Sequence, residues 1–571
     1  MPVLININEI NEVVRQLQVD PQGAIDEAKR LLSRSGNTRD AAFVTLRNLM
    51  AASALSLDKA DLAEKYITEG LAVDRSPHLL NTLAGIYRAR GDQAQGLLTI
   101  NEALTLQGDQ PEFHRTKAIL LFEGGRYSEL RQFLDSEVIV FPTLTRLQHL
   151  YTGGMDWREG DFDAAKRNLE KAIELQPTLP DAYFDLAQLH KAQGEHQNVV
   201  GTLLRLREVC PQLSEVQLAA LAEAYRETGD LSQAADIAKQ VLAINAVNLF
   251  ANITLAQVDA TNGRESDAID RLNRLLQHNL PDHLQSQVYR GLGEIHEVND
   301  DYKSAFTSYQ WANIADKRLV DNLGEHFKAG NDLALNSQRF PAHLKTLPSG
   351  VIAGRNHNFI ISLPGNESQL LAALLGEQSG VQSHSHNQNI VGLLAGTLPE
   401  ESNPQKLSEL CHDGQNVYWD PRFIFMLPQI KLRFPEANII WLTQHPKTVC
   451  LDAFAGAHDL TVYTAPFLTW PSTVNWISAM LTSWFTFAQQ ETKHYHQLSF
   501  ETFVSNPGIT VKPLLEFLNL EGEASISDGI LSRCRQAHQE SNRWISYPAE
   551  TTPYTRDFLN NCTKLGFIER Q

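Results

Sequence analysis

The sequence is poor in cysteine and in positive charge. Its 571 residues contain five cysteines, which lie far apart and form no Cys-x-x-Cys pair. An odd number of isolated cysteines predicts neither a disulfide framework nor a thiolate zinc site, and it favours a reducing compartment. Acidic residues outnumber basic ones by 67 to 49, so the formal net charge is −18. A surface of this sign repels phosphate backbones and anionic lipid head groups, which argues against nucleic acid and membranes as partners.

Targeting signals and long apolar runs are missing as well. The N-terminal stretch Met-Pro-Val-Leu-Ile-Asn-Ile-Asn lacks the basic and apolar regions of a signal peptide. No uninterrupted apolar stretch approaches the roughly 20 residues that span a bilayer. A Walker motif, Gly-x-x-x-x-Gly-Lys-Ser/Thr, is also absent, which leaves ATP hydrolysis unsupported. We therefore expect a cytoplasmic protein, folded into at least two structural units because of its length.

What the sequence does have is a repeat in its first half. Before each of a series of glycines stands an apolar helical pattern, and after it a second helix rich in alanine. Pro177 and Pro211 end two of the units, because proline cannot continue a helix. Each glycine fits a helix end in the left-handed conformation. The glycines recur at intervals of 34 or 35 residues, at Gly91, Gly125, Gly160, Gly194, Gly229 and Gly263.

The pattern resembles the tetratricopeptide (TPR) repeat, whose period is 34 residues. The resemblance covers about residues 41–315, or about eight repeats, and in the last copy Asn299 stands where the glycine would be. It implies an array of helix pairs whose concave face holds an extended peptide or a partner helix. The alanines, leucines and tyrosines of the pattern are interpreted as core packing between helices. Residues 1–40 are predicted to form an N-terminal helical cap, and residues 316–355 a helical linker.

From about residue 356 the pattern changes to short apolar runs. The runs 359–363, 416–419, 438–442 and 496–500 indicate buried strands, and helical patterns lie between them. Alternation of strand and helix predicts a parallel sheet with helices on both faces. The expected fold class is therefore an all-α TPR solenoid followed by an α/β domain over residues 356–571.

The order of these segments is similar to that of the sulfotransferase family in its bacterial form, fused to TPR repeats. The segments that carry the resemblance are Leu363-Pro364 before a polar loop, Phe434 to Pro446, Leu498 to Pro507, Leu514 to Leu520 and Asn542 to Tyr547. The resemblance implies a P-loop-type α/β fold. It also implies a transferase activity, in which a sulfuryl group moves from 3′-phosphoadenosine 5′-phosphosulfate (PAPS) to a hydroxyl or amine.

The family's first donor-binding motif is present in altered form. In the family, the loop after the first strand reads Pro-Arg/Lys-Ser-Gly-Thr-Thr/Ser, and its backbone N–H groups hold the 5′-phosphosulfate. Here only Pro364, Ser368 and Leu370 match. The cation is replaced by Gly365, the glycine by Glu367 and the second hydroxyl by Gln369. A unit charge on Glu367 about 4 Å from an incoming anion would cost roughly 4 kcal/mol at an effective dielectric constant near 20.

The motif for the 3′-phosphate is altered in the same direction. The family pattern Arg-x-Pro-x-Asp-x-x-x-Ser corresponds to residues 444–452, where Gln444 replaces the arginine and Asp452 the serine. A bidentate cation is lost, and a negative charge stands where a hydroxyl donor belonged. Lys447 is interpreted as a solvated surface lysine, with partial replacement of the lost cation as the alternative.

The catalytic base that the resemblance implies is a glutamate about 22 residues beyond the loop proline. Counting from Pro364 reaches His386, and a histidine can take a proton from an acceptor hydroxyl near neutral pH. His386 is thus the candidate base, and the alternative interpretation is a polar loop histidine. The pairs His384/His386 and His494/His496 could each supply two metal ligands, but no spacing supplies the remaining ones, so no metal site is predicted.

Two functional hypotheses follow. In the first, the chain is a TPR scaffold for a protein or peptide, and its sulfotransferase-like domain is a catalytically inactive or much weakened pseudoenzyme with no certain cofactor. In the second, it is an active PAPS-dependent sulfotransferase that acts on a peptide or glycan held by the TPR domain. A cleft remodelled for a neutral or cationic ligand is a third alternative. The replacements at Glu367, Gln444 and Asp452 favour the first hypothesis, because electrostatic stabilisation is normally the largest catalytic term.

Overall fold

The structure, a computed structural model, falls into two compact units. One consists of Met1–Asp156 and Ala164–Ala182, and the other of Trp157–Asp163 and Tyr183–Gln571. No helix in the described residues has both the length and the apolar character needed to cross a membrane. The described residues are 5–36, 38–57, 59–140, 145–159, 162–278, 280–322, 356–365, 367–385, 390–391, 394, 414–456, 464–490, 495–520, 526–548 and 552–567.

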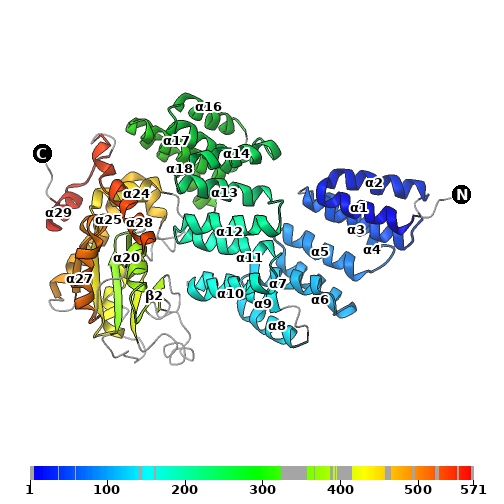
Figure 1. The fold of residues 1–571 in the computed structure, drawn as a ribbon, viewed down its shortest axis with the longest axis horizontal. Coiled ribbons are helices and arrows are strands. Elements are labelled where there is room, and N and C mark those ends of the chain that lie inside the picture. Colours follow the sequence, from blue (N-terminus) through cyan, green and yellow to red (C-terminus); the bar gives the residue numbers. More distant parts are fainter. Residues whose placement is uncertain are drawn as a thin grey trace. The chain divides into compact units, whose positions relative to one another are not determined.

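Helical repeats fill the first unit and open the second (Figure 1). From α1 to α8, and again from α12 to α18, each helix packs on the next one in the sequence. The earlier helices are α1 (Ile7–Val19), α2 (Pro21–Arg34), α3 (Ala41–Ser56), α4 (Ala60–Leu71), α5 (Pro77–Ala89), α6 (Gln93–Leu106), α7 (Pro111–Glu123), α8 (Tyr127–Val140), α9 (Thr145–Glu159) and α10 (Phe162–Leu175). The later helices are α11 (Pro180–Ala192), α12 (His196–Val209), α13 (Glu215–Glu227), α14 (Leu231–Ile244), α15 (Leu249–Thr261), α16 (Glu265–Leu276), α17 (Asp282–Val298) and α18 (Tyr302–Asn322).

The periodic glycines end helices in the left-handed conformation, as predicted. Gly160 lies outside the described residues. In the last repeat the left-handed residue is Asp300, with φ +58°, and Asn299 before it is the C-cap of α17, so the predicted alignment of this copy is one residue off. The other periodic glycines have φ between +68° and +83°, at Gly91, Gly125, Gly194, Gly229 and Gly263.

An aspartate that follows two of these glycines starts the next helix. The carboxylate of Asp92 accepts a hydrogen bond from the N–H of Gln95 at 3.1 Å. That of Asp230 accepts one from the N–H of Gln233, also at 3.1 Å. Such N-caps satisfy backbone donors that have no partner within the helix. The Gly-Asp pairs of the sequence therefore encode a helix end and a helix start in two adjacent residues.

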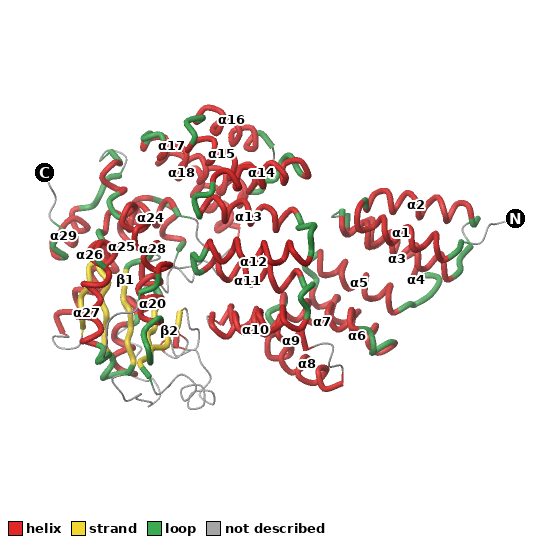
Figure 2. Tube along the Cα trace, viewed as in Figure 1, coloured by secondary structure: helices red, strands yellow, loops and turns green. Residues whose placement is uncertain are grey.

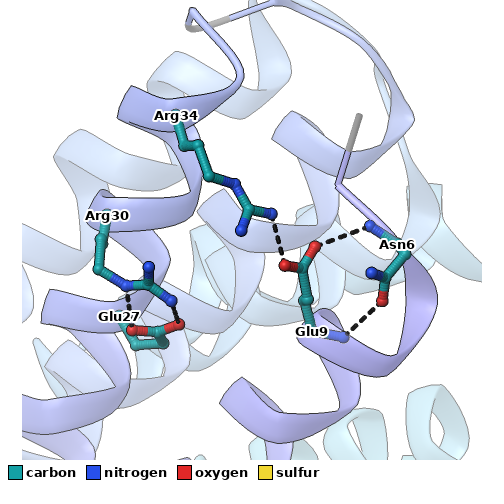
Figure 3. A network of polar contacts seen from close by, with 5 residues as sticks. All are labelled: Asn6, Glu9, Glu27, Arg30 and Arg34. Carbon is teal, nitrogen blue, oxygen red and sulfur yellow. Dashed lines mark hydrogen bonds and ion pairs between the residues drawn. The ribbon is translucent and has the colours of Figure 1, made fainter. Parts of the chain in front are cut away.

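The first two helices are joined by a polar network (Figure 3). Asn6 and Glu9 form a capping box at the start of α1, with hydrogen bonds of 3.0 and 3.1 Å. Glu9 also accepts a hydrogen bond from Arg34 at the end of α2, and this bond holds the pKa of the Glu9 carboxyl below its usual value. Arg30 pairs with Glu27 one turn away on α2. These contacts set α1 against α2 at the surface of their apolar core.

The α/β domain is built on a parallel sheet (Figure 2). The four predicted apolar runs form β1, β3, β4 and β5. The short edge strand β2 was not predicted, because its sequence Val-Gln-Ser-His-Ser is polar. The sheet order is β2-β3-β1-β4-β5, with bounds β1 (His357–Ser362), β2 (Val381–Ser385), β3 (Gln415–Trp419), β4 (Asn438–Thr443) and β5 (Tyr495–Ser499).

Helices cover both faces of the sheet. Ile360 and Ile440 pack into one apolar layer, while Phe359 and Trp441 pack into the other. Because both faces are buried, these strands are apolar at successive positions. The helices of the first layer are α20 (Glu367–Gly376), α26 (Phe500–Ser505), α27 (Pro507–Phe517) and α28 (Asp528–Glu540). Those of the second are η5 (Phe423–Phe425), α23 (Leu427–Arg433), α24 (Pro446–Ala455), η6 (Ala465–Leu468), α25 (Trp470–Gln490) and α29 (Arg556–Lys564), and η7 (Arg543–Ser546) lies near the C-terminus.

The last repeat helix belongs to the same core as the sheet. Phe306 of α18 stacks on Phe454 of α24, with 5.0 Å between the ring centroids, and meets Trp470 edge-on at 5.4 Å. Helical repeats followed by an α/β domain with a parallel sheet are the predicted fold class. The domain boundaries stay predictions, because α18 runs past residue 315 and residues 323–355 of the predicted linker lie outside the described ones.

Candidate functional site

The carboxyl ends of β1, β4 and β5 lie side by side at one edge of the sheet. The segment after β1 leads through Gly365 into α20, which begins at Glu367. The segment after β4 begins with Gln444, and Glu501 is the second residue after β5, in the first turn of α26. In open parallel sheets, ligands bind at this edge. The altered motifs of the sequence therefore converge on the expected place.

The loop after β1 is occupied by the side chain of Glu367. A Cβ added to Gly365 would come within 1.9 Å of the Oε2 atom of Glu367. The glutamate side chain thus folds back over the loop, where the resemblance to sulfotransferases puts the donor's phosphosulfate. Gly365 permits this contact because it has no side chain, and its φ of +153° is one that other residues rarely adopt.

The carboxyl of Glu367 holds its proton near neutral pH. Desolvation, first, and the nearby Asp452 and Glu501 raise its pKa to about 8, while a hydrogen bond with Gln444 acts in the opposite direction. Part of the residue remains accessible to solvent, but its carboxyl lies among other protein groups. The predicted unit charge on Glu367 is therefore wrong at pH 7, where most molecules carry the neutral acid. At that pH the side chain obstructs the loop by its bulk rather than by its charge.

Asp452 lies beside an arginine for which sequence reasoning had no role. The Nη1 atom of Arg543 is 3.3 Å from the Oδ1 atom of Asp452, and its Nε atom is 3.0 Å from the Oε1 atom of Glu297 in α17. Tyr547 donates a hydrogen bond to the same glutamate. Desolvation alone would lower the pKa of Arg543, but Asp452 and Glu297 outweigh it and raise the pKa. No spacing in the sequence links these residues, since they come from α17, α24 and η7.

Lys447 is not a solvated lysine. Its ammonium lies 4.7 Å from the ring centroid of Trp544 and 5.0 Å from that of Tyr554. The ring of His445 stacks on Trp544 at 4.5 Å, and the backbone N–H of His445 donates to Oε1 of Glu501 at 2.7 Å. The cation is therefore held by aromatic rings at the rim of the strand ends.

The remaining residues predicted to bind the donor in the loop after β1 do not all face the strand ends. Pro364 stands at the start of the loop, and Ser368 is buried in the first turn of α20. Gln369 is turned toward the repeats, and its Nε2 atom donates to the carbonyl oxygen of Ala192 at 3.2 Å. Of the residues predicted to contact the donor, the structure thus gathers Gln444 and Asp452 around Glu367 but not Gln369.

The candidate base His386 lies outside the described residues, as does His494. His384 on β2 contacts the Oδ1 atom of Asn416 through its Nε2 atom at 3.1 Å and stacks on Tyr418. His496 on β5 packs against Phe517. Across the part of the chain that the structure describes, no three His, Cys, Asp or Glu side chains gather in a way that could hold a metal ion.

Comparison with known proteins assigns both parts of the chain. Residues 271–524 match the model of the sulfotransferase family, and residues 157–194 match a model of the TPR repeat. The chain therefore carries TPR repeats together with a sulfotransferase-family domain, which confirms the predicted resemblance. The sulfotransferase match begins within α16, so it includes the two helices of the last repeat, and α18 shares its core with the sheet.

Individual relatives are distant. An uncharacterised protein of Aquifex aeolicus (strain VF5) is 23% identical over 407 residues, which cover 63% of this chain and 51% of that protein. The chain thus spans about half the length of that relative. The Cut9–Hcn1 hetero-tetramer of the APC/C is 16% identical, with 55% of this chain and 61% of that chain covered and a TM-score of 0.38. The sulfotransferase domain of the olefin synthase from Synechococcus PCC 7002 is 14% identical, with 39% and 98% covered and a TM-score of 0.30.

Proposed function

We propose that the chain is a TPR scaffold for a protein or peptide, and that its sulfotransferase-family domain does not transfer sulfuryl groups from PAPS. The observation that carries this proposal is the position of Glu367. Its side chain fills the loop after β1 in front of Gly365, where an anionic donor would need backbone N–H groups. A phosphosulfate could enter only if this side chain left its desolvated position beside Gln444.

The charges around the loop support the same proposal. Asp452 stands in place of a hydroxyl donor, and its own cation, Arg543, is shared with Glu297. Two carboxylates thus balance one guanidinium before any ligand arrives, and an added phosphate would compete with both of them. Glu501 adds a third carboxylate near Glu367. This set of donors and charges does not fit PAPS, and we derive no reaction step through it.

The scaffold half of the proposal rests on the repeats. Most of their buried apolar residues pack between neighbouring helices, while others, among them Leu98 and Phe250, are exposed and can contact a partner. Arrays of this kind mainly bind extended segments or partner helices.

A ligand titration tests the loss of donor binding. Thermal unfolding of the full chain is followed with 3′-phosphoadenosine 5′-phosphate (PAP) and with PAPS, and calorimetry is added if a shift occurs. A ligand that binds only the folded state stabilises it by about 2.7 kcal/mol at a hundredfold excess over its Kd. We expect no shift at millimolar ligand, and a saturable shift would contradict the proposal.

A matched pair of variants connects the result to the loop. In Glu367→Gly with Gln444→Arg, the obstructing carboxyl is removed and a bidentate cation is restored, so we expect PAP affinity to appear. Gly365 stays unchanged, because a side chain at its φ of +153° would be strained. The control is Glu208→Gln, which adds one charge unit at an exposed position of α12, as the double variant does at pH 7, where Glu367 is protonated. If the control bound PAP and the double variant did not, the loop residues would not be the cause of the lost PAP affinity.

The second candidate function is the active sulfotransferase with His386 as base. One observation favours it, namely that Arg543 brings a guanidinium next to Asp452 at the 3′-phosphate motif. The assay measures PAP released from PAPS in the presence of hydroxyl-bearing peptides and glycans, with His386→Ala as control. We expect no release above the blank, whereas release that depends on His386 would establish the enzyme.

A further inference from the structure

A small groove lies on the first helices of the last three repeats. It has a volume of about 290 Å³ and is lined by residues of α13, α15 and α17, with Ala455 and Gly456 at the end of α24 closing one side. These three helices contact one another in succession. The volume is at the lower end of ligand sites, which measure roughly 300–1,000 Å³. It suits one long side chain and the adjoining backbone better than a nucleotide.

The groove contains buried polar atoms that have no partner among the described residues. They are the Oε1 atom of Gln257, the Oε1 atom of Gln287 and the Nε atom of Arg226. A buried polar group without a hydrogen bond costs about 1–3 kcal/mol. The two carboxamide oxygens lie on neighbouring helices, α15 and α17, and each needs a donor. A peptide backbone supplies N–H donors at regular spacing along an extended chain.

A carboxyl group lies in the same groove, and it forms no ion pair within 4 Å among the residues that the structure describes. Glu294 of α17 is accessible to solvent, yet desolvation by the surrounding walls raises its pKa, while the nearby Arg226 acts in the opposite direction. Gln257 donates a hydrogen bond to it. The two arginines that line the groove are engaged, Arg226 with Glu227 and Arg290 with Asp316. Glu223 is paired with Lys191, so Glu294 is the carboxyl group of the groove that can pair with an added cation.

We propose that this groove binds an extended peptide through a lysine or arginine side chain, which pairs with Glu294 while Gln257 and Gln287 accept hydrogen bonds from the peptide backbone. The proposal rests on the scaffold function proposed above, for which it names the place and the chemistry of binding. Phe250, 46% exposed at the groove, offers an apolar surface to the stem of such a side chain.

The bound peptide lies close to the strand ends of the α/β domain. Glu294 is one helical turn from Glu297 on α17, and Glu297 holds Arg543, which pairs with Asp452. Ala455 and Gly456 at the end of α24 form one wall. The sulfotransferase-family domain therefore contributes to the groove through the helix that carries Asp452.

Two peptides that differ in one charge test the proposal on the full chain. The first is Gly-Ser-Ala-Arg-Ala-Ser-Gly with blocked ends, and the second has citrulline in place of arginine, which keeps the shape and removes the charge. Calorimetry should show saturable binding of the arginine peptide, about tenfold tighter than the citrulline peptide. Equal affinities, or no binding of either peptide, would overturn the proposal.

Variants locate the site. Glu294→Gln keeps the shape and the contact with Gln257, and we expect it to bind both peptides equally. Glu208→Gln removes a charge from an exposed position of α12 and should leave the tenfold preference unchanged. If Glu294→Gln fails to fold, Gln257→Leu with Gln287→Leu replaces it and should weaken both peptides alike. Retention of the preference in Glu294→Gln, or unchanged affinity in the leucine variant, would assign the binding to another surface.

Failure of this test is distinguishable from failure of the proposed function. The peptide experiments involve no nucleotide. A negative result would therefore overturn the proposed peptide site without changing the interpretation of the PAP titration. PAP binding, conversely, would overturn the non-catalytic assignment whatever the groove binds.

Discussion

At the scale of single residues, Glu367 decides what the strand-end site can accept. The glutamate stands where the family has glycine, and its side chain uses the space that Gly365 leaves. Its surroundings also change its protonation, because Asp452, Glu501 and desolvation all disfavour the charged form. A residue that would be acidic on the surface is therefore mostly a neutral hydrogen-bonding group at pH 7.

This shift predicts how stability depends on pH. The pKa of Glu367 is about 8 in the folded chain against an ordinary value of 4.5, so folding binds a proton between these values. Stability contributed by this group is complete below pH 4.5 and is lost as pH rises through 8. We expect Glu367→Gln to exceed the stability of the wild type by at most about 1 kcal/mol at pH 5 and by roughly 2–4 kcal/mol at pH 8.

Urea unfolding followed by tryptophan fluorescence measures this difference, since six of the eight tryptophans lie beyond residue 356. Glu208→Gln, exposed on α12, should show no pH-dependent change. A Glu367→Gln variant that is no more stable than the wild type at pH 8 would show that the carboxyl is ionised there without cost.

At the scale of elements, the turns of the repeat depend on backbone conformation. Gly229 ends α13 at φ +83°, and Gly201 lies inside α12. A Cβ would meet no atom within 4 Å at either position. Steric contacts with neighbouring residues therefore do not contribute to the change in stability. Gly229→Ala should cost about 1 kcal/mol, because the left-handed region disfavours a side chain. Gly201→Ala should stabilise by about 0.5–1 kcal/mol, since alanine favours the helix interior.

Thermal unfolding followed by circular dichroism compares the two variants with the wild type. The chemical change is identical, so the opposite signs report only the backbone conformation at each site. Shifts of the same sign would contradict the assignment of Gly229 to a helix end.

Strands were predictable where they carry an apolar run. β1 and β4 are buried at every position, and their apolar runs show this directly. β2 was not predicted, because it becomes a strand by pairing with β3, and its polar residues do not indicate this pairing. The same limit applies to the end of α17, where Asp300 rather than Asn299 takes the left-handed conformation. Either residue type tolerates it, so the spacing alone did not distinguish them.

At the scale of the whole molecule, a buried arginine joins the last repeat to the α/β domain. Arg290 of α17 is 7% exposed and binds Asp316 at 2.6 Å and the carbonyl oxygen of Ala455 at 2.7 Å. Asn313 of α18 donates to the carbonyl oxygen of Phe454 at 2.8 Å. Two side chains of the repeats thus satisfy carbonyl groups at the end of α24, which the helix itself leaves unpaired.

Replacement of Arg290 should destabilise α18 and α24 together. Arg290→Ala leaves the carboxylate of Asp316 buried without its cation, which costs about 3–5 kcal/mol. The control is Arg318→Ala, which removes a pair with Asp282 on the same helices at a side chain that is 50% exposed, and should cost at most about 1 kcal/mol. Hydrogen exchange of α18 and α24 measures the effect. Unchanged exchange of α24 in Arg290→Ala would show that the repeats and the domain are stable independently.

By itself, the sequence determined the two fold classes and most of the elements, because the glycine period, the apolar pattern and the segment order act locally along the chain. It also determined which positions depart from the donor motifs, at Glu367, Gln444 and Asp452. Only the tertiary structure decided what those departures mean, since Arg543 reaches Asp452 and the pKa of Glu367 rises through groups from separate elements. Charge, burial and hydrogen bonding depend on distance in space, and these distances are set when the last repeat and the sheet share one core.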